Sequence, residues 1–519
     1  MIRLFKKLHR WPSVIIAFFA MMFATSGIIM NHRETFSSVE VSRKLLPHNY
    51  RYKNWNLAAV RGSLNLNSDT SLLYGNIGIW STTDDFGTFS DFNQGFPDGV
   101  DNRKIYSVVK FSDNVLVAGT HFGLYTRRTD EESWKKLHLN GEEDRIADLA
   151  MKDDTLIILS RHFLFKTADL VRIEKHQLPV YEGYVRKTGL FNTLWELHSG
   201  ELWGITGKLI VDLLGIVVIV LSITGLLHFL FPGIIRRWKA KAKPVSQIQA
   251  FNKKNMRWHN VIGYVFVPFL IINTTAGMFL RPPLLIPIAN SRMGIIPGTH
   301  LDTPNPWFDK LRRISWDVNL NKYIISTTEG FFLSDESLSE PLGLLRFQPP
   351  VSLMGCNIFE NAGDGTFIVG SFNGIFSWNT GSQMVTDYFT GKPVTRQEGT
   401  GKPVSENMAA GMVKTSGKGD FWFDYNRGAE PMAGPENAGT AGTRFPAMPR
   451  FILENAPMSL WNVAQEFHTG RIFEHLTGPF YILYVPLAGL CLLTVLVSGF
   501  FMWWLVYRKK RISNRKPSE

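Results

Sequence analysis

Runs of apolar residues and runs of alternating apolar and polar residues divide this chain into two kinds of segment. Four apolar runs are long enough to cross a bilayer as helices, which takes about 20 residues: Trp11–Met30, Leu209–Phe231, Val261–Leu280 and Phe480–Val506. Two long segments with shorter, strand-like patterns separate the first run from the second and the third from the fourth. The pattern predicts a membrane α-helical bundle of four helices with two large inserts.

The predicted segments follow the order helix, insert, helix, and this order occurs twice. We expect transmembrane helices at 1–31, 196–231, 259–281 and 466–507, β-rich inserts at 32–195 and 282–465, a basic loop at 232–258 and a basic tail at 508–519. Basic residues precede the first run, as in a signal peptide. However, this run is longer than the usual signal core and has a counterpart later in the chain. We therefore expect it to be retained as a helix.

The helices carry an internal duplication. LHRWPSVIIAFFAMMFATSGIIM (8–30) and RWHNVIGYVFVPFLIINTTAGMF (257–279) each place a histidine 16 residues before a threonine and 18 before a glycine. The sequences ELHSG (196–200) and EFHTG (466–470) precede the second and fourth helices in the same way. The second copy has about one helical turn of additional residues after its histidine. Small residues near the helix ends would let helices, or a flat cofactor, approach closely.

The inserts contain a repeat of their own, in which a short apolar strand, a turn and a second apolar strand recur. Five clear copies and one degenerate copy occur at 71–83, 115–127, 156–168, 323–335, 367–379 and 420–428. Successive clear copies within an insert start 41 to 44 residues apart, which is the period of a four-stranded propeller blade. We therefore expect about three blades from each insert, closing together into one β-propeller. The alternative is two separate β-rich domains.

The net charge of +12 is concentrated in three short segments. Residues 1–10, 232–259 and 507–519 carry more positive charge than the whole chain does, so the remainder is acidic. This distribution follows the positive-inside rule, which places both termini and the middle loop in the cytoplasm and both inserts outside. The charge therefore indicates membrane lipid as a partner and argues against nucleic acid.

Seven of the thirteen histidines lie at predicted membrane boundaries. His9 and His32 are 23 residues apart, about 34 Å along a helix, which is roughly the thickness of the hydrocarbon core. The histidines therefore form two layers. The cytoplasmic layer holds His9, His228 and His259, and the outer layer holds His32, His198, His468 and His475.

Paired histidines on neighbouring helices are typical of a b-type haem site, because imidazole is a usual axial ligand of haem iron. The duplication offers His9 with His259 in one layer and His198 with His468 in the other, and so predicts two haems. His32, His228 and His475 are alternatives. His475 follows His468 by seven residues, so both could face one side of a helix.

Other interpretations of these residues remain open. A single interfacial histidine is more often hydrogen-bonded at the headgroups than a ligand. A zinc or copper site lacks its usual motifs, and the two cysteines, Cys356 and Cys491, cannot build a thiolate site. Asp212 lies within an apolar run and could pair with Lys208, which we favour slightly, or relay a proton.

Charged residues flank the outer histidines. Three acids could orient an imidazole or simply lie among the headgroups: Glu196, Glu201 and Glu466. Four arginines could neutralise haem propionates, attract an anionic substrate or anchor the helices at the interface: Arg33, Arg186, Arg281 and Arg471.

Taken together, these motifs resemble the PepSY-associated transmembrane family. The resemblance covers the four helices, about a quarter of the chain. The residues that carry it are Leu8–Trp11, Thr25–Gly27, Asn31–Glu34, Glu196–Gly200, Glu466–Gly470, Thr224-Gly225 and Ser498-Gly499.

The resemblance implies a bacterial inner-membrane redox protein. Family members include reductases that release iron from ferric siderophores on the periplasmic side, using b haems between the four helices. On this basis His9, His198, His259 and His468 are the first candidate ligands, and His32 is next. The inserts do not resemble the PepSY module. Because no glycine-rich phosphate loop follows a strand, electrons would come from a quinol or a separate cytoplasmic reductase.

Two functions from different classes follow. The first is a di-haem electron-transfer protein that reduces a periplasmic acceptor such as a ferric chelate. The alternative is a non-enzymatic, membrane-anchored propeller that acts as a sensor or binds a periplasmic partner protein. A transporter subunit is a weaker third interpretation, which only Asp212 supports.

Overall fold

The computed structural model describes residues 2–139, 145–352, 355–394, 405–415, 419–434 and 444–513. Residues 514–519 of the expected basic tail therefore lie outside the described residues. The chain divides into two compact units. The helical unit contains residues 1–36, 186–302 and 460–519, and the β unit contains residues 37–185 and 303–459.

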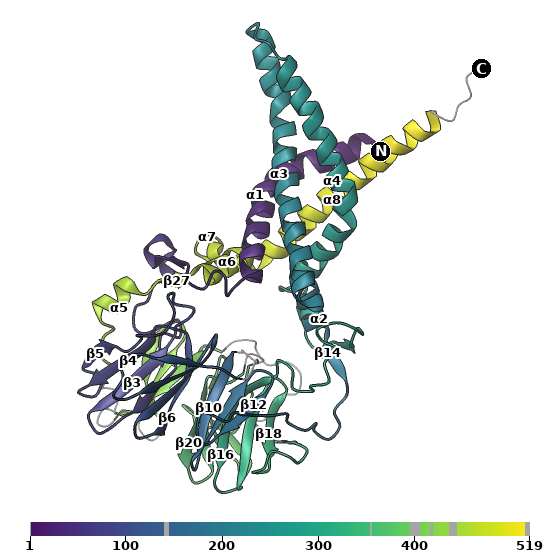
Figure 1. The fold of residues 1–519 in the computed structure, drawn as a ribbon. Coiled ribbons are helices and arrows are strands. Elements are labelled where there is room, and N and C mark those ends of the chain that lie inside the picture. The colour runs from purple at the N-terminus through teal and green to yellow at the C-terminus, as the bar shows by residue number, and fades with distance from the viewer. Residues whose placement is uncertain are drawn as a thin grey trace. The chain divides into compact units, whose positions relative to one another are not determined.

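Four long helices form the helical unit: α1 (Ile2–Asn31), α3 (Gly204–Ala240), α4 (Ser246–Met278) and α8 (Tyr484–Ser513). Helix α1 packs against α3 and α8, and α4 packs against the same two helices (Figure 1). This arrangement matches the sequence duplication, in which α1 corresponds to α4, and α3 to α8. All four helices are long and apolar enough to cross a membrane, which indicates a membrane protein.

The helix expected across residues 196–231 is interrupted. Helix α2 (Leu190–Ser199) ends at Gly200, whose φ of 81° is left-handed, and α3 begins only at Gly204. A Cβ atom at Gly200 would lie 2.2 Å from the backbone oxygen of Gly207, so only glycine permits this close turn. His198 therefore lies on a short helix that precedes the membrane span.

The second copy contains the same break. Helix α6 (Leu460–His468) is followed by Gly470, again with a left-handed φ of 77°. The four additional residues of this copy form the short helix α7 (Glu474–Thr477) before α8 begins. Gly204 and Gly478 then adopt nearly the same backbone conformation, with φ of 59° and 55°. The extra turn is thus inserted between two bends that both copies of the duplicated unit contain.

Among the described residues of the β unit, most belong to six antiparallel sheets, five with four strands and one with three. The first insert supplies β2 (Gly62–Asn65), β3 (Thr70–Gly75), β4 (Gly78–Thr83) and β5 (Thr88–Asp91); β6 (Ile105–Ser112), β7 (Val115–Thr120), β8 (Gly123–Arg128) and β9 (Lys135–Leu137); and β10 (Ile146–Lys152), β11 (Thr155–Ser160), β12 (Leu164–Thr167) and β13 (Glu174–His176). The second insert supplies β16 (Leu311–Asp317), β17 (Lys322–Thr327), β18 (Gly330–Ser334) and β19 (Gly343–Leu344); β20 (Ile358–Gly363), β21 (Thr366–Ser371), β22 (Gly374–Asn379) and β23 (Met384–Asp387); and β24 (Ala409–Val413), β25 (Phe421–Asp424) and β26 (Gly428–Pro431).

The six sheets form a closed ring. The first strand of each sheet contacts the first strand of the next, and β24 of the last sheet contacts β2 of the first. The sheets therefore resemble the blades of a β-propeller, with the first strand of each blade innermost. The six hairpins expected from the repeat are all present, each forming two middle or outer strands of one sheet.

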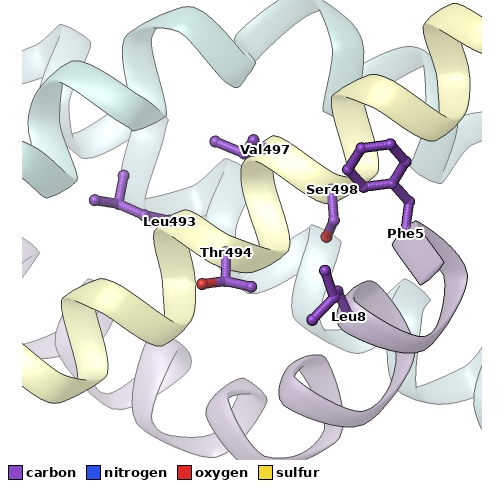
Figure 2. Close-up of a pocket in the computed structure, with 6 residues that line it drawn as sticks. All are labelled: Phe5, Leu8, Leu493, Thr494, Val497 and Ser498. Carbon is purple, nitrogen blue, oxygen red and sulfur yellow. The ribbon is translucent and has the colours of Figure 1, made fainter. Parts of the chain in front are cut away.

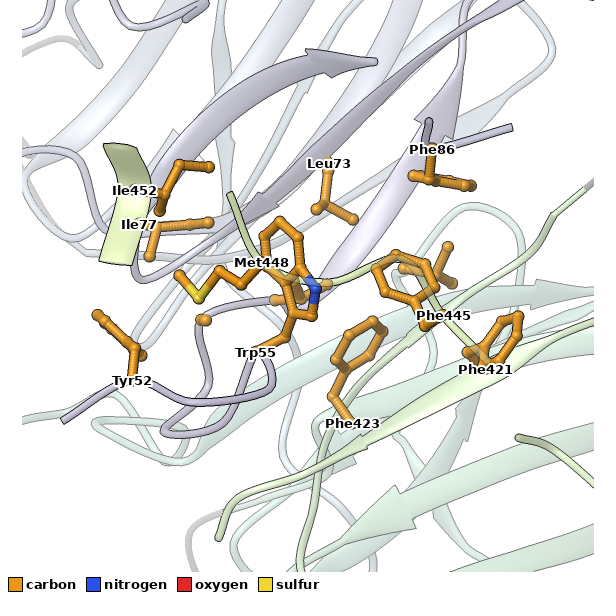
Figure 3. Close-up of a cluster of buried hydrophobic side chains, with 13 residues drawn as sticks. Tyr52, Trp55, Leu73, Ile77, Phe86, Phe421, Phe423, Phe445, Met448 and Ile452 are labelled. Atoms are coloured by element: carbon orange, nitrogen blue, oxygen red, sulfur yellow. The ribbon is translucent and has the colours of Figure 1, made fainter. Parts of the chain in front are cut away.

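A cluster of buried aromatic residues closes the ring (Figure 3). Trp55, from the first insert, is fully buried against Phe421, Phe423 and Phe445 from the second. Its indole Nε1 donates a hydrogen bond to the backbone oxygen of Pro446 at 2.7 Å. The two inserts thus share one core at the seam between the first and last sheets.

A short pair of strands lies in each unit, near the points where the chain enters and leaves it. In the β unit, β1 (Glu40–Val41) pairs with β27 (Met458–Ser459). In the helical unit, β14 (Lys187–Gly189) pairs with β15 (Arg292–Gly294). The helix α5 (Arg450–Asn455) precedes β27. These pairs hold the segments that enter and leave each unit.

Candidate functional site

Four histidines of the helical unit meet as two pairs. The ring centres of His9, on α1, and His259, on α4, lie 6.3 Å apart. The ring centres of His198, on α2, and His468, on α6, lie 5.9 Å apart. We call these the first and second histidine pairs. They combine the duplicated positions of the sequence symmetrically, one residue from each half of the chain.

The hydrogen bonds of three of these rings fix their tautomer. The Nδ1 atom of His9 lies 2.9 Å from the backbone oxygen of Val495. The Nδ1 atom of His198 lies 3.0 Å from the oxygen of Asn273, and that of His468 lies 3.1 Å from the oxygen of Phe23. A backbone oxygen can only accept, so each Nδ1 must carry the proton. The Nε2 atom of each neutral ring is then the one that can bind a metal.

The Nδ1 atom of His259 also carries the proton, and the acceptor of its hydrogen bond is a hydroxyl group. Its Nδ1 atom lies 2.8 Å from Oγ1 of Thr224. That hydroxyl donates its own hydrogen to the backbone oxygen of Val220 at 2.6 Å. Thr224 therefore accepts from the ring, and Nε2 again keeps its lone pair. Such orienting hydrogen bonds on the far nitrogen are the usual support of a metal-binding histidine.

A glycine of a neighbouring helix lies beside each of the four rings. A Cβ atom at Gly277 would lie 2.6 Å from Cε1 of His198, and one at Gly499 would lie 2.9 Å from Cε1 of His9. Gly27 and Gly225 lie against His468 and His259 in the same way, with a distance of 3.4 Å. Each histidine therefore packs against the small-residue motif of another helix, not of its own.

The spacing of the pairs fits one metal ion between two imidazoles. Metal–nitrogen bonds of about 2 Å, with about 1 Å more from each nitrogen to its ring centre, place the two ring centres roughly 6 Å apart. Both pairs lie near this distance. Among the described residues, no group of three or more His, Cys, Asp or Glu side chains could hold a metal ion. Two axial ligands per site are what a haem requires.

An apolar hollow lies beside the first pair, between α1 and α8 (Figure 2). Its volume is about 290 Å³, and its lining consists of Phe5, Leu8, Leu493, Thr494, Val497 and Ser498. Leu8 precedes His9, and Ser498 precedes the glycine that packs on that ring. The surroundings of the first pair therefore suit a flat, apolar group.

Two arginines contact residues next to His468 of the second pair. Arg281 donates to the backbone oxygen of Thr469 at 3.3 Å, and Arg471 pairs with Glu466 at 2.5 Å. Burial lowers the pKa of Arg281, and the charge of Arg471 lowers it further. Arg281 therefore lies beside the residue that follows His468, and Arg471 lies beside the carboxylate of Glu466.

The other two predicted arginines have different partners. Arg33 stacks on Trp461, with its guanidinium carbon 3.9 Å from the ring centre. Arg186 pairs with Asp302 at 2.5 Å. These contacts are those of structural anchors near the ends of the helical unit.

His32 belongs to a third grouping. Its Nε2 atom lies 2.6 Å from Oδ2 of Asp212, and Asn31 donates to the other carboxylate oxygen at 3.0 Å. The favoured pairing of Asp212 with Lys208 is therefore wrong. Lys208 pairs instead with Glu201 at 2.8 Å, because the break before α3 brings Glu201 back beside it.

The remaining candidate histidines are hydrogen-bonded to other residues. His228 contacts Oδ1 of Asn252 through Nδ1 at 3.1 Å. His475 is exposed on α7, with Nδ1 2.7 Å from the backbone oxygen of Ile472. The expectation that His475 and His468 share one helix face is wrong, because the chain turns at Gly470 between them.

The glutamates predicted near the outer histidines contact residues other than the four paired histidines. Glu196 is buried, and its Oε1 atom lies 3.6 Å from Nδ1 of His300. This contact raises the pKa of His300. The suggestion that Glu196 or Glu466 orients an imidazole of the pairs therefore finds no support in these contacts.

Sequence analysis missed one contributor to the site, Asn273. Its side-chain amide donates to the backbone oxygen of His198 at 2.9 Å, and its own backbone oxygen accepts from the His198 ring. The sequence did contain a signal for this residue, because the side-chain amide of an asparagine within an apolar helix needs a hydrogen-bond partner there.

Comparison with solved structures finds distant likenesses, of which three follow. One is the extracellular domain of BT4673 from B. thetaiotaomicron, with 10% identity and a TM-score of 0.33; the match covers 74% of this chain and 40% of that chain. Another is the WD40 β-propeller domain of Doa1, with 8% identity, a TM-score of 0.32 and coverage of 76% and 95%. A third is the N-terminal domain of Nup159, with 8% identity, a TM-score of 0.29 and coverage of 69% and 72%. The chain thus spans less than half the length of the first of these.

A search of curated proteins finds no match to this chain. The family model of the PepSY-associated TM region matches residues 2–231, which include α1, the first insert and most of α3. The matched region carries two of the four paired histidines, His9 and His198, and the duplication supplies their counterparts in the second half. The match to the PepSY-associated TM region family therefore covers residues 2–231 of this membrane protein.

Proposed function

We propose that this protein is a b-type di-haem electron-transfer protein of the bacterial inner membrane. His9 and His259 would hold one haem, and His198 and His468 the other. Haem iron with two imidazole ligands supplies one-electron redox chemistry. The observation that supports this most is the state of the four rings, since each holds its proton on Nδ1 and leaves Nε2 available.

The surroundings of the rings support the same assignment. The glycines leave room for the four imidazole rings to pack closely, and the hollow beside the first pair has a largely apolar lining. Arg281 and Arg471 could neutralise propionate groups near the second pair. A tetrahedral zinc site would need further ligands, which neither pair offers among the described residues.

The two pairs are spaced for transfer across a membrane. On α1, His9 belongs to the first pair, and Phe23 and Ser26 contact His468 of the second. Position 26 is about 25 Å from position 9 along a helix. With both termini cytoplasmic, as the basic segments favour, the first pair would take electrons from a quinol or a cytoplasmic reductase. The second would deliver them to a periplasmic acceptor, plausible acceptors being ferric siderophores and other ferric chelates.

The first experiment is an optical spectrum of the full-length protein in detergent, oxidised and then reduced with dithionite. We expect sharp b-type bands and two haems per chain by pyridine haemochrome assay. Protein from haem-replete cells that contains no haem would overturn the proposal and favour a membrane-anchored propeller without redox function. Reoxidation by ferric citrate would then test the class of acceptor.

A further inference from the structure

Helices α3 and α4 both continue beyond their apolar runs. The run of α3 ends at Phe231 and that of α4 begins at Val261, yet α3 continues to Ala240 and α4 already starts at Ser246. The additional lengths are about 14 Å and 22 Å along the two helix axes. Figure 1 shows the two helices running side by side to this end. We call residues 232–260 the hairpin extension.

Specific contacts hold the two helices together where the extension begins. The Nδ1 atom of His228 lies 3.1 Å from Oδ1 of Asn252. The ring centres of Phe231 and Phe251 lie 5.6 Å apart. Asn255 is buried, and its amide donates to a backbone oxygen of α3 at 2.8 Å. The extension therefore leaves the bundle in a fixed direction, and its side chains form a defined surface.

The surface of the hairpin extension carries only positive charge. Its eight basic residues are all exposed: Arg236, Arg237, Lys239, Lys241, Lys243, Lys253, Lys254 and Arg257. The chain has no acidic residue between Asp212 and Asp302. None of the eight forms an ion pair with any residue that the structure describes. The fold thus gathers eight cations without supplying a counter-charge.

The start of α1 adds to this surface beside the first histidine pair. Four exposed basic residues surround His9 in the sequence: Arg3, Lys6, Lys7 and Arg10. The guanidinium carbon of Arg10 lies 5.0 Å from the ring centre of Phe229 on α3, so the two basic segments adjoin. His259 lies at the base of the extension, one residue before its end. The basic surface is therefore continuous with the end of the bundle that holds the first pair.

Lipid phosphates can reach only part of this charge. The polar layer of a bilayer adds about 5–8 Å on each side of the hydrocarbon core. Measured from the ends of the apolar runs, Arg236 and Arg257 lie at about 8 and 6 Å, within this layer. Five lysines lie about 10 Å or more from those ends: Lys239, Lys241, Lys243, Lys253 and Lys254. These lysines face water, where a soluble anionic partner can contact them.

An aromatic side chain among the outer lysines favours a protein as that partner. Trp238 is 40% exposed, and Nζ of Lys243 lies 6.0 Å from its ring centre. Exposed tryptophans are enriched where proteins bind one another. We propose that the hairpin extension docks an acidic, soluble protein that carries one electron at a time.

This inference rests on the proposed function, because electrons would enter at the first pair, at the base of the extension. The carrier would be oxidised by one electron for each electron that enters the protein. Opposite charges would guide it to this end of the bundle and fix its orientation, as is usual for charged partners that associate briefly. Of the two donors considered above, the extension therefore favours a cytoplasmic protein over a quinol.

Isothermal titration calorimetry of the full-length protein in a neutral detergent tests the docking, with flavodoxin, a small acidic flavoprotein, as the probe. We expect one flavodoxin per chain, and binding at least tenfold weaker at about 200 mM than at about 20 mM NaCl. Absence of binding at low salt would overturn the inference and leave the haem assignment intact. Because the readout is heat, protein without haem that still binds flavodoxin would overturn the haem assignment alone.

Two triple variants locate the docking surface. The first removes three outer charges: Lys239→Gln, Lys241→Gln and Lys243→Gln. It should bind flavodoxin about tenfold more weakly and with a smaller salt dependence, because fewer charges attract the partner. The matched control removes the same charge from exposed positions of the β unit: Arg172→Gln, Lys322→Gln and Lys392→Gln. Thermal unfolding confirms that both are folded, and equal binding by the two variants would contradict the proposed surface.

Anionic lipid is the competing occupant of the hairpin extension. Micelles doped with phosphatidylglycerol, followed by quantification of the lipid that stays bound after purification, measure this occupancy. We expect the wild type and the first triple variant to retain equal amounts, because the outer lysines lie beyond the headgroups. Loss of lipid from that variant, together with no flavodoxin binding by the wild type, would assign the surface to lipid and overturn the proposal.

Discussion

At the scale of single residues, each histidine of the two pairs is oriented by one hydrogen bond and one small neighbour. The hydrogen bond holds the proton on Nδ1, and the glycine leaves space at Cε1. Both features come from helices other than the one that carries the histidine. The tautomer and orientation of each ring are therefore set by neighbouring helices. Its position in the sequence sets only its approximate depth in the membrane.

The ligand assignment predicts the haem content of single variants. His198→Ala and His468→Ala should each reduce the haem content from two per chain to one, because each removes an axial ligand of the same site. His475→Ala is the matched control, since this histidine is exposed outside both pairs, and it should keep two haems. The pyridine haemochrome assay measures all three. Two haems retained in both pair variants would contradict the assignment.

The glycine beside His198 predicts a second effect. In Gly277→Ala, the new Cβ atom would lie 2.6 Å from Cε1 of His198, so the ring must move. We expect loss or a spectral shift of the second haem only. Gly233→Ala is the control, because a Cβ atom at this helical glycine of α3 meets nothing within 4 Å. Identical reduced spectra for the two variants would show that the close contact has no role.

At the scale of elements, α1 and α3 are joined by the contact of His32 and Asn31 with Asp212. Asp212 is mostly buried, and both partners depend on its carboxylate. Asp212→Ala should destabilise the helical unit by about 1–3 kcal/mol, since it leaves two polar groups without their acceptor. Asp212→Asn keeps one acceptor oxygen and should cost less.

Thermal unfolding in detergent, followed by circular dichroism, measures these losses. Ser13→Ala is the control, because this partly buried serine on α1 donates its hydroxyl hydrogen to the backbone oxygen of Arg10 within its own turn. Its melting temperature should match that of the wild type. An Asp212→Ala variant as stable as this control would show that the contact does not hold α1 to α3.

The duplicated breaks before α3 and α8 show how far elements can be predicted. The apolar runs predicted the four long helices, because length and hydropathy alone define a span. The breaks at Gly200 and Gly470 are not visible in hydropathy, since a glycine within a helical pattern is often tolerated. The close approach of Gly200 to Gly207, which only the folded chain contains, makes the turn necessary.

At the scale of the whole molecule, two inserts far apart in sequence share one ring of sheets. Trp55→Ala should destabilise the β unit by about 3–5 kcal/mol, because it removes a fully buried indole from the closing seam. The haem content should stay at two per chain, since the paired histidines lie in the helical unit. Near-ultraviolet circular dichroism and the haemochrome assay measure the two effects separately.

Phe347→Ala is the matched control for the seam, because Phe347 belongs to the same unit and is 60% exposed. Its unfolding temperature should change little, as is usual for exposed positions. A Trp55→Ala variant that unfolds at the same temperature as this control would mean that the aromatic cluster does not hold the ring closed.

Local patterns along the chain are enough to predict the number of membrane helices, the hairpins of the inserts and the set of histidines at the membrane boundaries. These features follow from local periodicity, composition and repetition, which a chain displays without folding. Which histidines face each other, and that Asp212 contacts His32 and not Lys208, could be known only from the folded chain. Each of these depends on contacts between segments far apart in the chain, and the positions of those contacts are set by packing and by backbone turns.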